Sequence, residues 1–286
     1  MSKSNMLLGL AKGKVGDLVF YRDGGEQRTR TRVIPKNPRT PAQMMQRVKI
    51  ANVSALYRAQ SAVLKSTFTN RPSNQSSYNA FASSALADAP YLTKTQASFN
   101  SIIPQPCLLA KGSLQALPFG WFTNDEDGDA YGLPITSSTA LTTVGAVSED
   151  LLNTYPNLME GDKIVFVQYK FDKVVPAVTS DDVFKATPTT KVFTIDSTST
   201  EALNSVGFVA EGGYFNATNT SFILEDVPVM FGYFLSRVDA DGRLEVSTAQ
   251  SVLPTASRNL WEEYTLYSQQ KKAIDSYSVG SESVVR

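Results

Sequence analysis

Short apolar runs of strand length, separated by turn residues, recur from Pro104 to about Leu253 and limit the fold more than any other feature of this chain. Apolar and β-branched runs of this length are typical of strands, and the Gly, Pro, Asn and Asp residues between them favour turns. The pattern predicts a mainly β body, sandwich-like or barrel-like. The expected strands are residues 163–171, 191–195, 207–210, 221–224, 229–238 and 244–248, with short helices at 148–155 and 199–204.

A basic hairpin is expected near the start of the chain. Residues 15–22 read as a strand, Asp23-Gly24-Gly25 suits a tight turn, and residues 27–34 form the return strand. Successive side chains of a strand point to opposite faces, so Arg28, Arg30 and Arg32 should share one face. Residues 9–15 resemble a phosphate-binding loop only superficially and are expected to be a flexible lead-in.

Helices are expected before and after the β body in the sequence. Thr40 is a suitable N-cap and Pro41 a suitable first residue for a helix that runs to about Leu64, with Arg47, Arg58 and Lys65 on one stripe. A second helix is expected at about residues 75–87 and a third at 257–276. The chain is thus expected to have an α+β fold in three parts: a basic hairpin and helical module (1–105), a β-rich body (106–256), and a C-terminal helix with a mobile tail (257–286).

The composition argues against most catalytic and metal chemistry. The chain has no histidine, which removes the usual general base and the commonest metal ligand. It has one cysteine, Cys107, which we expect to be a small buried residue, because a single thiol forms no internal disulfide and no structural zinc site. We expect no enzyme activity, no cofactor and no metal. No apolar run approaches the ~20 residues that span a bilayer, and the start of the chain lacks the pattern of a secretory signal.

Two other features invite a functional interpretation. The acidic run Asp125-Glu126-Asp127-Gly128-Asp129 has the carboxylate density of a calcium loop but not the spacing of an EF-hand, so a solvated turn is favoured over adventitious calcium. Four aromatic residues lie near this turn. They suit a core or intersubunit contact better than a ligand platform: Phe119, Trp121, Phe122 and Tyr131.

Charge is distributed very unevenly along the chain. Residues 1–72 hold 14 Lys and Arg against 3 Asp and Glu, a net charge of about +11, and the remaining 214 residues hold 13 against 24, a net charge of about −11. Such a basic segment can dock onto acidic protein, bind nucleic-acid phosphates or be a solvated face. Docking is favoured, because the same chain supplies a matching acidic body and few aromatic residues accompany the basic ones. The candidate partner-binding residues are Arg28, Arg30, Arg32, Lys36, Arg39, Arg47 and Arg58.

Several short motifs carry a resemblance to a known family. They are residues 13–21 (Gly-Lys-Val-Gly-Asp-Leu-Val-Phe-Tyr), residues 36–43 (Lys-Asn-Pro-Arg-Thr-Pro-Ala-Gln) with Arg47, and, further along, Tyr78-Asn79-Ala80-Phe81 and residues 109–114. Together they resemble a poorly characterised family of gut Bacteroidetes and the tailed phages that infect them. The resemblance covers roughly residues 9–116.

The resemblance implies a structural protein of a crAss-like phage virion, assembled in the host cytoplasm. The expected role is a ring-forming neck or tail subunit below the portal, whose partners are copies of itself in a symmetric homo-oligomer and adjacent virion proteins: portal, ring or tail. Two alternatives stay open. One is a capsid-associated or head-decorating protein of the same particle, and the other is a packaged DNA-binding protein.

Overall fold

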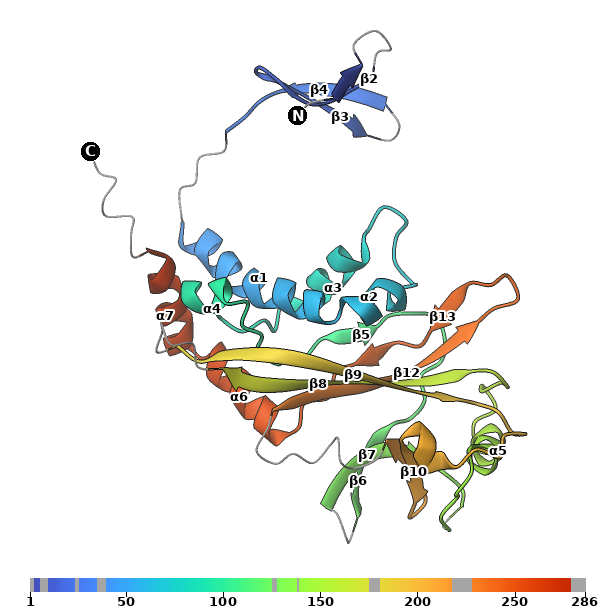
Figure 1. The fold of residues 1–286 in the computed structure, drawn as a ribbon. Helices are drawn as coiled ribbons and strands as arrows, with labels where there is room; N and C mark the ends of the chain where they lie inside the picture. The colour runs from blue at the N-terminus through green and yellow to red at the C-terminus, as the bar shows by residue number, and fades with distance from the viewer. Residues whose placement is uncertain are drawn as a thin grey trace. The chain divides into compact units, whose positions relative to one another are not determined.

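The computed structural model describes residues 3–5, 10–23, 26–34, 40–124, 128–137, 139–174, 181–217 and 228–278. The chain divides into two compact units, Met1–Thr40 and Pro41–Arg286, here called the N-terminal unit and the body. Helices and antiparallel strands in four sheets confirm the expected α+β class (Figure 1).

The N-terminal unit is a four-stranded antiparallel sheet. Its strands β1 (Lys3–Asn5), β2 (Leu10–Val15), β3 (Leu18–Asp23) and β4 (Glu26–Thr31) pair in chain order. The expected hairpin is confirmed as β3 and β4. Residues 10–15 are a strand and not a flexible lead-in, because Gly16, at φ +59°, turns the chain so that Lys14 pairs with Val19 and Gly13 with Phe20.

In the body, four helices form one layer (Figure 1). They are α1 (Pro41–Ala59), α2 (Ser61–Thr67), α3 (Ser77–Ala85) and α4 (Lys94–Ser98). The start of α1 at Pro41 is as expected, but the helix that was expected to reach Leu64 breaks at Gln60. Residues Met44, Val48 and Ala55 of its apolar stripe are buried. Asn52 anchors α1 by exchanging hydrogen bonds with the backbone of Ile103, at 3.0 and 2.8 Å.

A central antiparallel sheet lies against this helical layer. Its order is β13 (Leu244–Val246), β12 (Val229–Val238), β8 (Lys163–Val174) and β9 (Val183–Thr194). Both faces of β8 and β12 are buried, which explains why residues 229–235 are apolar without alternation. The helix-facing side chains are Val167, Tyr169, Phe171, Met230 and Phe234, and those on the other face are Ile164, Phe166, Phe231, Tyr233 and Leu235.

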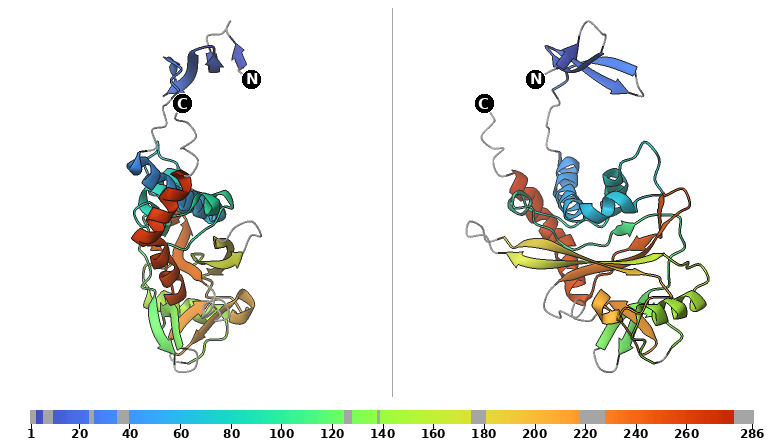
Figure 2. Two further views of the ribbon diagram at one scale, coloured as in Figure 1. Left: turned by 90° about the vertical axis from the view of Figure 1, so that its left-hand side faces the viewer. Right: turned by 45° about the vertical axis from the view of Figure 1, so that its right-hand side comes forward.

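The second face is covered by another sheet and a helix. This sheet has the order β10 (Phe208–Glu211), β11 (Tyr214–Ala217), β7 (Gly128–Pro134) and β6 (Gly120–Asn124), and α5 (Val144–Thr154) packs beside it. Figure 2 shows these elements on the opposite side of the central sheet from the blue and cyan helices of the body. The helix expected at 199–204 is a 3₁₀ turn at Leu203–Val206, and the strand expected at 221–224 lies outside the described residues.

The chain closes with a short ribbon and two helices. β5 (Leu108–Ala110) pairs with β14 (Ala249–Gln250), and the expected C-terminal helix is divided at Leu266 into α6 (Thr255–Thr265) and α7 (Tyr267–Ser278). The expected mobile tail lies outside the described residues.

The compact units differ from the three parts expected from the sequence. Helices α1–α3 share one core with β5, β8 and β12, so no boundary falls near residue 105. The C-terminal helices also belong to the body, because Tyr91 N–H donates to the carbonyl of Tyr264 at 2.9 Å and Lys94 N–H to the Ser276 hydroxyl at 2.9 Å. The division falls after Thr40 instead.

Candidate interaction sites

One face of the N-terminal sheet is cationic. Side chains directly opposite each other in an antiparallel pair lie on the same face. Lys14 is opposite Val19, Val19 is opposite Arg30, and Tyr21 is opposite Arg28. Lys14, Arg28 and Arg30 therefore share a face, and the guanidinium carbon of Arg30 lies 5.8 Å from the centre of the Tyr21 ring. These three residues are exposed and are called the cationic face from here on.

The other face of the same sheet carries apolar side chains. Val15, Leu18 and Phe20 alternate with the residues above: Val15 lies opposite Leu18, and Leu18 and Phe20 lie opposite Thr31 and Thr29 of β4. Val15 is 46% exposed and Leu18 47% exposed. No residue of this unit whose burial is described is buried. A sheet of three or more strands is stable alone only when it covers a hydrophobic face, and the described side chains of this unit form no buried core.

Three other candidate partner-binding residues belong to the first 40 residues: Arg32, Lys36 and Arg39. Arg32 follows the end of β4, where its N–H donates to the carbonyl of Asp17 at 2.6 Å and its side chain is exposed. Arg28 also lies 3.7 Å from Glu26, and both of these side chains are exposed. Lys36 and Arg39 lie outside the described residues.

Arg47 and Arg58 belong to α1 in the body, and they differ in environment. Arg47 is exposed on the helix surface. Arg58 donates to the Asn100 side chain at 2.9 Å and to the Ser54 carbonyl at 3.3 Å. Asn100 has φ +51°, and the Lys185 ammonium also donates to its carbonyl, at 3.4 Å. Arg58 therefore fastens α1 to the turn after α4, a role within the body that its basic character alone did not indicate.

A second candidate site is an open groove of about 630 Å³ in the body. It is called the aromatic groove here. It lies between β6 and β7, the segment after β14, and α6. Its lining residues are Pro106, Phe119, Gly120, Trp121, Tyr131, Ser251, Val252, Leu253, Arg258, Trp261 and Glu262.

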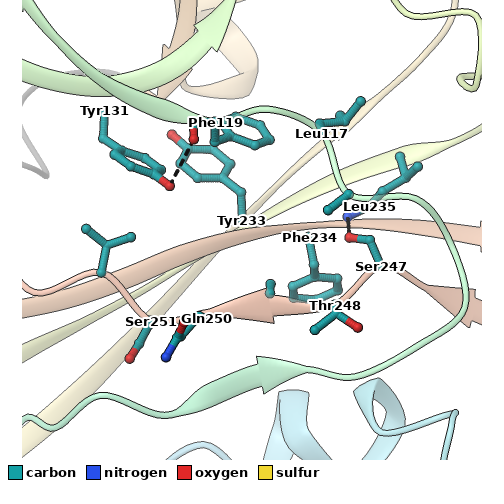
Figure 3. Close-up of a pocket in the computed structure, with 13 residues that line it drawn as sticks. Leu117, Phe119, Tyr131, Tyr233, Phe234, Leu235, Ser247, Thr248, Gln250 and Ser251 are labelled. Atoms are coloured by element: carbon teal, nitrogen blue, oxygen red, sulfur yellow. Dashed lines mark hydrogen bonds between the residues drawn. The ribbon is translucent and has the colours of Figure 1, made fainter.

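Stacked rings form the floor of the groove. Phe119 stacks on Tyr233 with ring centres 4.1 Å apart, and Trp121 meets Tyr131 edge to face at 5.4 Å. Figure 3 shows Phe119, Tyr131 and Tyr233 gathered at an adjoining cavity of about 280 Å³, with the Tyr131 hydroxyl donating to the Phe119 carbonyl at 3.3 Å. Burial raises the pKa of Tyr131 above its ordinary value.

Trp121 is 51% exposed at the mouth of the groove, whereas Phe119 and Tyr131 pack against the buried core. Trp261 enters from α6, fixed by its indole N–H donating to the Asp88 carbonyl at 2.8 Å. Trp261 falls within the helix expected at residues 257–276. Nothing in its spacing joined it to Trp121, which lies 140 positions earlier.

Two other expectations concern isolated groups. Cys107 is buried and free, as expected, and burial raises the pKa of its thiol to about 12 despite a hydrogen bond with Ser251. The acidic run is described only from Gly128, so the turn expected there lies outside the described residues. Within the described ranges no three Cys, Asp or Glu side chains gather as metal ligands. These ranges also contain no helix that is long and apolar enough to cross a membrane.

Comparison with protein-family models, curated proteins and solved structures gives no match to this chain.

Proposed function

We propose that this chain is a non-enzymatic structural subunit of a bacteriophage virion that forms a ring in the neck or tail below the portal. In this role the N-terminal unit docks onto the acidic body of an adjacent copy or onto a neighbouring virion protein. The motifs at residues 13–21 and 36–43 support the phage origin, and the charge distribution supports the mode of assembly.

One observation carries the docking proposal. The N-terminal sheet is a separate compact unit with an exposed cationic face, and none of its side chains with described burial is buried. Residues 1–40 hold 9 Lys and Arg against 3 Asp and Glu, and residues 41–286 hold 18 against 24, so the units carry about +6 and −6. Opposite charges favour contact between copies, and docking would cover the apolar face of the sheet.

Quantitative mass spectrometry of purified particles of the phage that encodes the chain tests this function. We expect a fixed copy number per particle. Charge reversal by Arg28→Glu and Arg30→Glu should reduce incorporation, whereas the control Arg243→Glu with Lys271→Glu, at two exposed cations of the body, should not. Absence of the protein from particles would overturn the proposed function.

The same variants separate docking from genome binding. Three clustered cations attract DNA in dilute salt whatever the function, because phosphate attraction is unspecific. We expect this affinity to disappear near physiological salt, since Tyr21 is the one aromatic residue on the cationic face within the described part of the sheet. Submicromolar DNA affinity retained at physiological salt would favour the packaged DNA-binding protein.

A further inference from the structure

Both tryptophans of the chain, Trp121 and Trp261, line the aromatic groove, and Trp121 is half exposed there. Large aromatic side chains in a groove with a polar rim mark binding sites for extended peptides. None of the candidate partner-binding arginines that the structure describes lines this groove, so it is a second candidate surface, on the body.

We propose that the aromatic groove binds an extended segment of a second copy of this chain, namely residues 31–40, anchored by Val33 and Ile34. The proposal rests on the proposed function in one respect, that copies of the chain associate. It adds the acceptor site for that association.

The apolar pair Val33 and Ile34 supports this occupant. Val33 is 77% exposed and Ile34 73% exposed, although both are large apolar side chains and adjacent. An exposed pair of this kind is stabilised when an apolar surface removes it from water. The aromatic groove offers that surface through Phe119, Trp121 and Leu253.

The sequence that follows the pair has the spacing that aromatic grooves recognise. Pro35-Lys36-Asn37-Pro38 has two prolines separated by two residues. Aromatic-lined grooves bind such P-x-x-P segments because proline restricts the free peptide and lowers the entropy lost on binding.

Charge also favours this pairing. The segment carries Arg32, Lys36 and Arg39 and no acidic residue. On the acceptor side Glu262 and Arg258 of α6 line the groove, and residues 41–286 hold 18 Lys and Arg against 24 Asp and Glu. The net negative charge of the body therefore attracts a basic peptide.

The geometry of such a contact suits a ring. The donated segment and the groove are different surfaces of one chain, so the contact is heterologous, and a heterologous contact repeats from copy to copy. It closes into a ring when the rotation between copies permits.

The experiment uses the full chain carrying Val33→Ser and Ile34→Ser, which keeps the groove but lacks its own anchors. A fluorescein-labelled peptide of residues 31–40 is titrated into it, and anisotropy gives the affinity. We expect saturable binding, with a blue shift of the tryptophan emission. A peptide with serine at positions 33 and 34 should bind at least about tenfold more weakly.

Two further full-chain variants locate the site. Trp121→Ala should weaken binding of the wild-type peptide about tenfold or more, and Val238→Ser, a control at a 62% exposed apolar residue, should not. Circular dichroism of both variants serves as the control for folding. Equal affinity of the two peptides, or binding unaffected by Trp121→Ala, would overturn the inference.

The wild-type chain tests whether the donor is a second copy. Its tryptophan emission should shift to the blue as protein concentration rises, and the serine variant should not show this shift. A shifted emission at every concentration would place the segment in the groove of its own chain and contradict the proposal. If the peptide does not bind but wild-type copies still associate and enter particles, this inference fails and the proposed function stands.

Discussion

Two arginines near the end of one hairpin form ion pairs in very different environments, one buried and one exposed. Arg237 of β12 donates to both oxygens of Asp162 at 2.7 Å and to the Asn157 carbonyl at 2.8 Å, and the Asp162 side chain is 1% exposed. The hydrogen bonds to Asp162 raise the pKa of Arg237. Arg243 lies 3.8 Å from Asp241, with both side chains more than 70% exposed. The first pair fixes the end of the central sheet, and the second is in solvent.

Substitution of each arginine by alanine should separate these environments. Arg237→Ala leaves the Asp162 carboxylate buried without its cation, so we expect a loss of about 3 kcal/mol in the free energy of unfolding. Arg243→Ala should change it by less than about 0.5 kcal/mol. Urea denaturation followed by circular dichroism measures both. A loss below about 1 kcal/mol for Arg237→Ala would show that the buried pair does not stabilise the body.

Burial also determines the chemistry of Cys107. Its pKa is raised to about 12, so the thiol is neutral in the folded chain at pH 8. We expect no reaction with a thiol-specific reagent until the chain unfolds. An unfolded cysteine ionises near pH 8.5, so the folded state should lose stability as the pH rises from about 8.5 towards 12, and Cys107→Ala should lack this component. Reaction of the native protein at pH 8 within minutes would contradict the assigned burial.

At the scale of elements, β12 is the centre of the body. It pairs with β8 and β13, contributes side chains to two cores, and bridges to Val252 through Phe231, with hydrogen bonds of 3.1 and 2.7 Å. The segment after β5 crosses close to β13. A Cβ atom at Gly112 would overlap the backbone carbonyl of Val246, so only glycine fits there.

Gly112→Ala should therefore destabilise the body. The clash is with backbone that cannot rotate away, so we expect a cost of about 3 kcal/mol, at the upper end for overpacking. Gly120→Ala is the matched control, because nothing lies within 4 Å of the added methyl group. Thermal unfolding of the two variants side by side measures the difference. Equal melting temperatures would mean that the segment after β5 does not lie against β13.

The elements show what the sequence can predict. The strand 229–238 was predicted with its observed bounds, because a strand with two buried faces has a long apolar run. The start of α1 was predicted from Pro41. β5 and β14 were missed because three-residue and two-residue strands have no detectable period. The break at Gln60 was missed because Gln60 is an ordinary helical residue, and its 1% exposure depends on how α2 packs.

In the candidate sites, too, local features were predicted and contacts between distant residues were not. Arg28 and Arg30 share a face as predicted, because strand alternation is a local property. The aromatic groove needed the fold, since β6, β7 and α6 bring Trp121, Tyr131 and Trp261 together from distant positions. For the same reason the bond between Arg58 and Asn100, 42 residues apart, was not foreseen.

At the scale of the whole molecule, two units of opposite charge lie on one chain, about +6 on the first and −6 on the second. None of the N-terminal side chains whose burial is described is buried, and one face of this sheet carries exposed apolar residues. The body has two large buried clusters and a smaller third one, and its surface includes the aromatic groove. In an assembly where each copy docks its N-terminal unit onto the next, the apolar face of the sheet would be covered. The positive charge of that unit would also lie near the negative charge of the body.

Sedimentation velocity of the full chain across a salt series tests this account most directly. We expect the wild type to associate at low ionic strength, with assembly that slows as salt screens the charges over about 10 Å or less. Arg28→Glu with Arg30→Glu should remain monomeric, Arg28→Lys with Arg30→Lys should associate, and the control Arg243→Glu with Lys271→Glu should behave as wild type. A wild-type chain that stays monomeric at high concentration and low salt, or a charge-reversed variant that associates equally well, would contradict assembly through the cationic face.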